Sequence, residues 1–252
     1  METGITVPSD LSSWEAVATA ALAQAIGATQ VDASLGANRG CGVIDLLAAA
    51  GLRYSQTNLR VSTFNYDAAF RLVDQDPRAY VSTLALASGI LYTSKLQLAL
   101  AEPPKLGHFP GRQKGIVLAP YGIRQELDLP RQVWFAVETL LRSYGVPVYL
   151  VGDPGQRMDN AAFAEHEILS DLGMQSKIDY IAEAALVVGV PNAWTWMAAS
   201  FDRKLAYLYP ETLPPRRWFH YQSNNFGRIL FHPNKIQLPV ALAGLRELIR
   251  GF

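Results

Sequence analysis

The sequence is poor in the residues that most often bind metals or form cross-links. It has one cysteine, Cys41, and four histidines, His108, His166, His220 and His232, among 252 residues. A single thiol excludes an intramolecular disulfide and a multi-cysteine metal site, and the histidines lack the spacing of a metal-binding pair. We therefore expect no metal site.

The sequence also lacks an excess of charge of either sign, since 22 Lys and Arg residues balance 22 Asp and Glu residues. A neutral chain has no overall field that draws it toward nucleic acid or an anionic membrane, so a site for a polyanion must be local. No apolar run approaches the roughly 18 residues of a spanning helix, and the N-terminus, METGITVPSDLSSWEAV, does not resemble a secretory signal. We expect a cytoplasmic protein without a transmembrane segment.

Hydrophobic residues, in contrast, make up 50% of the chain, enough to bury a sizeable core. The segment 102–111 concentrates proline and glycine, and it separates two regions that each alternate strand and helix. We therefore expect two α/β domains, over residues 1–104 and 112–252.

The expected elements follow a similar order in both halves. In the first half we expect helices at 10–27, 43–50 and 67–74, strands at 30–35, 59–64 and 80–86, and a glycine-rich turn at 36–42. In the second half we expect helices at 131–144, 161–172 and 239–249, and strands at 115–119, 148–151, 185–190 and 205–209. Because short apolar strands that alternate with helices are typical of parallel sheets, we expect the last four strands to share one parallel sheet.

The most informative stretch runs from Asp179 to Pro210 and is predicted to form helix, buried strand, polar break, helix and strand. Ligands of open parallel sheets bind beyond the carboxyl ends of the strands. Residues 191–195, which follow the strand at 185–190, therefore lie where a ligand is expected.

The run from Gly189 to Ala199 resembles the donor-domain motif of the heptosyltransferase-like (family 9-like) GT-B glycosyltransferases. In that motif an apolar strand leads into Asp-Ser-Gly-x-x-His and a small-residue helix. The small-residue helix is retained here, and the motif's Asp, Ser, Gly and His positions are occupied, in order, by Pro191, Asn192, Ala193 and Trp196. The order of elements matches the family over roughly residues 115–252, about half of the chain.

The resemblance implies an α/β, GT-B-like fold of two Rossmann-like domains with parallel sheets. Residues 1–104 would then form the N-terminal acceptor-side domain, and residues 112–252 the C-terminal nucleotide-sugar-binding domain. The resemblance also implies metal-independent transfer of a sugar from a nucleotide-sugar to a hydroxyl acceptor, with the nucleotide-sugar as substrate and no other cofactor. The identity of the acceptor stays open.

Residues after the first two strands of the second half are candidates for donor binding. Tyr121 and Gly122 follow strand 115–119, where the resembled family has a turn whose amides approach the donor's phosphates. Arg124 is the nearby cation that could replace the family's lysine, or it is a solvated turn residue. Asp153, after strand 148–151, could bind a ribose hydroxyl or form an Asx turn.

The helix that follows strand 185–190 gives further candidates. Asn192, Ala193 and Thr195 lie at its start, where unpaired N–H groups and a partial positive charge suit a diphosphate. Alternatively, Asn192 and Thr195 only cap the helix, each cap contributing about 1 kcal/mol. Trp194 and Trp196 could stack on a base or sugar, or fill the core.

The stretch 203–235 is basic and rich in aromatic residues. Arg216 and Arg217 follow a proline pair in it, so they could clamp a diphosphate, contact a nucleic-acid backbone, or be solvated. Overall neutrality favours the small anion over nucleic acid.

A glycosyltransferase also needs a base for the acceptor hydroxyl. In the resembled family this base is an aspartate in the first glycine-rich loop, and the nearest counterparts here are Asp45 and Asp32. We predict Asp45 as the catalytic base, with stabilisation of the helix dipole as its alternative role. Two other functions stay open. The four replaced motif positions suggest a non-catalytic GT-B-like binding module, and the basic stretch suggests a glycosyltransferase that modifies nucleic-acid bases.

Overall fold

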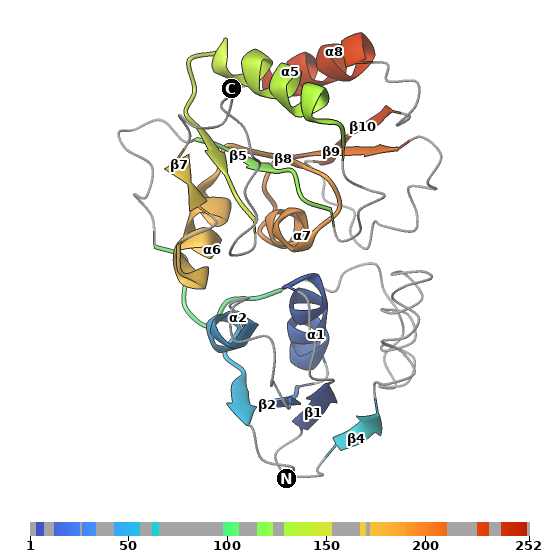
Figure 1. Ribbon diagram of the computed structural model, residues 1–252. Coiled ribbons are helices and arrows are strands. Elements are labelled where there is room, and N and C mark those ends of the chain that lie inside the picture. Colours follow the sequence, from blue (N-terminus) through green and yellow to red (C-terminus); the bar gives the residue numbers. More distant parts are fainter. Residues whose placement is uncertain are drawn as a thin grey trace. The chain divides into compact units, whose positions relative to one another are not determined.

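The computed structural model describes residues 4–7, 13–25, 27–33, 43–55, 62–65, 98–105, 115–122, 129–152, 167–169, 172–210, 226–231 and 238–250 (Figure 1). These residues group into two compact units, one up to Pro103 and the other from Pro104 onward. The predicted domain limits, 1–104 and 112–252, stay a prediction. No helix among the described residues is long and apolar enough to cross a membrane.

The first unit contains a parallel sheet in the order β3-β2-β1-β4. Its strands are β1 (Gly4–Val7), β2 (Gln30–Ala33), β3 (Arg53–Ser55) and β4 (Ser62–Asn65), and its helices are α1 (Ser13–Ala25) and α2 (Val43–Ala49). Helix α1 ends in a glycine stop, as predicted. Gly27 has φ of 70°, which an L side chain rarely adopts, and the N–H of Ala28 bonds the carbonyl of Ala23 at 2.8 Å.

The second unit contains a parallel sheet in the order β10-β9-β8-β5-β6-β7. Its strands are β5 (Ile116–Ala119), β6 (Val148–Leu150), β7 (Glu167–Ile168), β8 (Leu186–Gly189), β9 (Leu205–Pro210) and β10 (Phe226–Phe231). All of its strand pairs are parallel. The prediction that four of these strands, β5, β6, β8 and β9, share one parallel sheet is confirmed.

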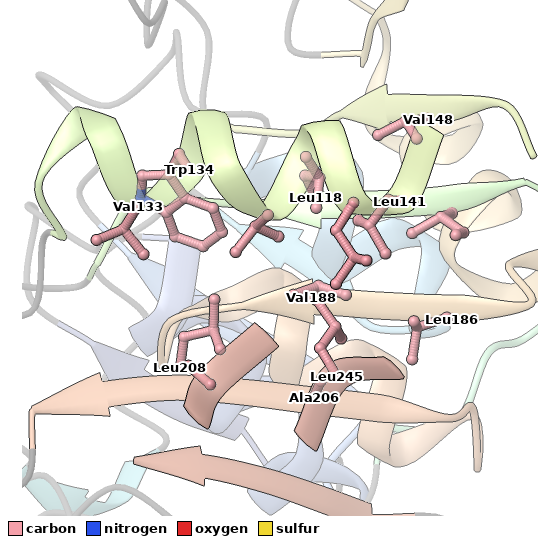
Figure 2. Close-up of a cluster of buried hydrophobic side chains, with 14 of the residues drawn as sticks. Leu118, Val133, Trp134, Leu141, Val148, Leu186, Val188, Ala206, Leu208 and Leu245 are labelled. Atoms are coloured by element: carbon pink, nitrogen blue, oxygen red, sulfur yellow. The ribbon is translucent and has the colours of Figure 1, made fainter. Parts of the chain in front are cut away.

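Four helices accompany this sheet, and Figure 1 shows α5 and α8 on one face and α6 and α7 on the other. Their bounds are α5 (Arg131–Arg142), α6 (Met174–Glu183), α7 (Ala193–Ser200) and α8 (Leu238–Ile249). Alternate strand residues, such as Ile116, Leu118 and Val188, pack with Trp134 of α5 and Leu245 of α8 in one buried cluster (Figure 2). This core fixes the strands whose carboxyl ends form the candidate site.

Some predicted elements differ from the structure. The helix expected over 161–172 is wrong at Glu167–Ile168, which form strand β7. Pairing with β6 outweighs the helix preference of this alanine- and glutamate-rich sequence. Strands β1, β3 and β10 were not predicted. The glycine-rich turn at 36–42, the helix at 67–74 and the strand at 80–86 lie outside the described residues.

Candidate functional site

The candidate site is the edge of the second unit's sheet at which the parallel strands end. Strand β5 has β8 on one side and β6 on the other, so their exits are neighbours. Ala119 ends β5, Gly152 follows β6, and Val190 follows β8. Ligands of open α/β sheets bind at this edge.

Helix α7 starts directly after the exit of β8, and its first turn is closed by a capping box. The Asn192 side-chain oxygen accepts a hydrogen bond from the Thr195 N–H at 2.9 Å, and the Asn192 N–H donates to the Thr195 hydroxyl at 3.0 Å. This exchange satisfies main-chain donors that a helix start otherwise leaves without an acceptor.

The same asparagine connects α7 to the exit of β5. Its Nδ2 donates to the carbonyls of Ala119 at 3.0 Å and Tyr121 at 2.9 Å. Because the Asn192 side chain uses its acceptor for the cap and its donors for two carbonyls, it holds the α7 start and the β5 exit in one arrangement. The residue is 5% exposed.

Thr195 connects α7 to β8, the strand before it, and to β9, the strand after it. It is fully buried, and its hydroxyl lies 3.1 Å from the Val190 carbonyl at the exit of β8. It also hydrogen-bonds the side chain of Tyr207 on β9. Burial raises the pKa of the Tyr207 hydroxyl above its usual value, and the hydrogen bond with Thr195 opposes this shift. Tyr207 is therefore neutral at physiological pH.

Lys177 of α6, which sequence reasoning missed, connects α7 to the exit of β6. Its side chain is 1% exposed, and its Nζ donates to the Gly152 carbonyl at 3.1 Å. The same nitrogen lies 5.2 Å from the ring centroid of Trp194, in the first turn of α7. The sequence held a signal, since Lys177 has apolar Met174 three residues before it and Ile181 four residues after it, and so shares their buried helix face.

Gly189 allows these elements to approach closely. A Cβ at this position would lie 2.5 Å from the Ala119 carbonyl oxygen and 2.8 Å from the Thr195 Cγ2. The end of β8 therefore has no room for a side chain between β5 and α7.

The structure brings several predicted donor-site residues to this edge. Tyr121 and Gly122 follow β5 and are partly buried, whereas Asn192, Ala193, Thr195 and Trp196 are buried at the start of α7. Burial of Trp194 and Trp196 at 2% and 3% exposure agrees with their alternative role of filling the core. Contact of these residues with a donor stays a prediction.

The other predicted residues lie elsewhere. Asp45 belongs to the first turn of α2 in the first unit, and its side chain is exposed. The remaining candidates fall outside the described residues: Arg124, Asp153, Arg216 and Arg217. Among the described residues, no group of three or more His, Cys, Asp or Glu could hold a metal ion.

The chemistry that this edge favours is anion binding. The capping box occupies the Thr195 N–H, but the other N–H groups of a helix's first turn have no acceptor within the helix. Together with the helix dipole they place a partial positive charge at its start. The strand exits converge on that start in α7. The arrangement suits a phosphate or diphosphate group.

No family model and no curated protein matches the sequence. The fold, however, is similar to solved structures. ADP-heptose LPS heptosyltransferase II of E. coli matches with a TM-score of 0.60 and 12% identity, over 100% of this chain and 99% of the other. The chain has a heptosyltransferase-like GT-B fold. The predicted α/β, GT-B-like fold class is thus confirmed, and so is the predicted resemblance of this fold to that of the heptosyltransferases.

Two other structures with a similar fold are named for different activities, a glycosyltransferase and an epimerase. The iron-containing dodecameric glycosyltransferase TibC from enterotoxigenic E. coli H10407 matches with a TM-score of 0.59 and 14% identity, over 90% of this chain. The match spans 62% of TibC, less than two thirds of its length. A putative UDP-N-acetylglucosamine 2-epimerase from Listeria monocytogenes matches with a TM-score of 0.54 and 11% identity, over 99% of this chain and 88% of the other.

Proposed function

We propose that the protein is a GT-B glycosyltransferase that moves a sugar from a nucleotide-sugar donor to a hydroxyl acceptor without a metal ion. The donor's diphosphate binds at the start of α7. The observation that carries this proposal is the set of buried contacts that fixes the first turn of α7 to the exits of β5, β6 and β8. A rigid helix start can stabilise the negative charge that grows on the departing diphosphate.

The donor proposed first is an ADP-sugar. The name of the E. coli protein with the same fold includes ADP-heptose, whereas that of the Listeria protein includes a UDP-sugar. Both are nucleoside diphosphate sugars, so the shared chemistry is a diphosphate between a nucleoside and a sugar.

Asp45 is proposed as the base that deprotonates the acceptor. Its exposed side chain agrees with this role, because a base must reach a substrate hydroxyl. Asp45→Asn is expected to lower kcat while leaving ADP affinity unchanged. If Asp45→Asn kept full activity, Asp45 would not be the base, and its only role would be to stabilise the dipole of α2. The cytoplasmic location and the independence from metal also remain predictions.

The direct test is a binding panel on the full chain. ADP, UDP, GDP and CDP are compared with their nucleosides by calorimetry and thermal unfolding. A diphosphate at about 100 times its dissociation constant should stabilise the protein by roughly 2.7 kcal/mol, whereas the nucleoside should bind more weakly. If no diphosphate binds, the non-catalytic module becomes the better account.

The fold alone does not separate sugar transfer from epimerisation, because a fold hosts several chemistries. A nucleotide-sugar that binds should therefore be incubated with the protein and its products identified. Release of the nucleoside diphosphate supports transfer or hydrolysis, whereas a changed sugar on an intact nucleotide supports an epimerase. Nothing in the described part of the chain favours a nucleic acid as the acceptor, so we do not propose one.

A further inference from the structure

We propose that Lys177 is a positioning residue of the donor site, which fixes the exit of β6 to the first turn of α7 and thereby sets the shape of the nucleotide-binding edge. This inference rests on the proposed function, because it assigns a role within the same site. Lys177 lies on α6, outside the strand exits and outside the resembled motif.

The first argument is the cost of burying this side chain. An ammonium group at 1% exposure gives up its hydration, and a lysine stem loses rotamer freedom when it is held in one place. A methionine could fill a similar volume without the loss of hydration. What distinguishes Lys177 from an apolar side chain at this position is therefore the contacts of its ammonium group, not its packing.

The second argument is what the ammonium contacts. Its Nζ donates to the carbonyl of Gly152, directly beyond β6, and it lies 5.2 Å from the centroid of the Trp194 ring in α7. One side chain of α6 thus joins two segments that belong to different strand exits. Both contacts depend on the charge or on the N–H donors, and neither can be made by an apolar side chain.

The third argument is that Lys177 and Asn192 connect the start of α7 to two adjacent strand exits. In the sheet order β8-β5-β6, Asn192 fastens the α7 start to the exit of β5, and Lys177 fastens it to the exit of β6. The α7 start is thus held against the exits of both β5 and β6. A ligand that spans these exits depends on their spacing, because misplacement by about 1 Å can cost a large factor in function.

The test compares Lys177→Met with Arg203→Met in the full chain. Arg203 donates from Nε to the Phe201 carbonyl at 3.0 Å, just past the opposite end of α7. The control thus also removes one charge and one hydrogen bond to a carbonyl, but away from the strand exits. The readouts are ADP affinity by calorimetry, urea unfolding, and exchange without nucleotide of the Val151 amide, which donates to the Leu118 carbonyl at 2.8 Å.

Lys177→Met is expected to weaken ADP binding by about tenfold or more and to exchange faster at the Val151 amide. Its urea midpoint should stay near that of the parent, because relief of the buried charge offsets the loss of the donor to the Gly152 carbonyl. Lys177→Arg, which keeps the charge, should recover part of the affinity, and Arg203→Met should bind ADP as the parent does. If Lys177→Met does not fold, Lys177→Gln takes its place, since its shorter side chain cannot reach the Gly152 carbonyl.

The proposal is overturned if the Lys177→Met protein binds ADP as tightly as the parent, or if Arg203→Met loses as much affinity. A parent that binds no nucleoside diphosphate is a failure of the proposed function, which is a different result. In that case amide exchange decides the role of Lys177. Faster exchange at Val151 supports positioning of the strand exit, and unchanged exchange overturns it.

Discussion

Asn192 combines a helix cap with a connection between two distant segments. As a simple cap, it would contribute about 1 kcal/mol. The structure adds two hydrogen bonds from its Nδ2 to the carbonyls of Ala119 and Tyr121. Removing the side chain therefore breaks these two hydrogen bonds as well as the cap, and the effect on stability should exceed that of a cap.

We predict that Asn192→Ala lowers the free energy of unfolding by about 2–4 kcal/mol, because it removes the helix cap together with two hydrogen bonds of about 1 kcal/mol each. The Ala119 carbonyl keeps one donor, the Val190 N–H at 3.2 Å. Asn192→Asp should cost at least as much at neutral pH. Its carboxylate keeps the acceptor for the Thr195 N–H but faces the two carbonyl oxygens without a proton to donate. Urea unfolding measures both variants. A loss near 1 kcal/mol in each would mean that Asn192 is only a cap.

Gly189 offers a second test at the scale of one residue. We predict that Gly189→Ala destabilises the protein by about 1–3 kcal/mol or more, because its Cβ would meet the Ala119 carbonyl at 2.5 Å. Gly173, which precedes α6, is the matched control. A Cβ there meets nothing within 4 Å, so Gly173→Ala should change stability by no more than about 1 kcal/mol. Equal melting temperatures for the two variants would contradict the close packing at the end of β8.

At the scale of elements, the sequence predicts those whose local pattern has few alternatives. β5 and β8 are short apolar runs buried along their whole length, which is typical of central parallel strands. β7 and β10 lie at the two edges of the sheet and were missed. Two-residue β7 has too few residues for a pattern, and its strand conformation depends on pairing with β6.

The same distinction applies to the candidate site. The sequence places Asn192 and Thr195 at a helix start, because capping residues lie next to the helix that they cap. It does not identify the partners of Asn192, since Ala119 and Tyr121 lie 73 and 71 residues away along the chain. Lys177 was missed for a related reason, because Gly152 becomes its partner only once the strand order is known.

Helix α8 should depend on one face for its attachment to the sheet. Its buried residues Ala241, Leu245 and Ile249 recur every four positions, whereas Val240 is 60% exposed. We predict that Leu245→Ala lowers the free energy of unfolding by about 2–5 kcal/mol, because it leaves a cavity in the core. Val240→Ala, in the same helix, should stay within about 0.5 kcal/mol of the parent. Chemical unfolding that ranked the two variants the other way would show that α8 packs through a different face.

At the scale of the whole molecule, each unit has its own parallel sheet and its own buried residues. In the first unit, Ala16 and Val17 of α1 and Leu46 of α2 are buried, and the second unit has the larger cluster around α5 and α8. A unit with its own core can in principle respond to a ligand by itself. Because the proposed diphosphate site is built from residues of the second unit, ADP should stabilise that unit more than the first.

We predict that this difference is visible in a protein that carries Trp14→Phe and Trp218→Phe. Its remaining tryptophans, Trp134, Trp194 and Trp196, are all buried in the second unit, so their fluorescence reports that unit. Circular dichroism reports the helices of both units. With ADP at about 100 times its dissociation constant, the fluorescence transition should move to higher urea, since binding adds roughly 2.7 kcal/mol to the unit that binds. The circular dichroism transition should broaden, because the first unit gains nothing from the ligand. Coincident transitions that shift together would mean that the two units unfold as one, and a fluorescence transition that does not move would place the ligand site outside the second unit.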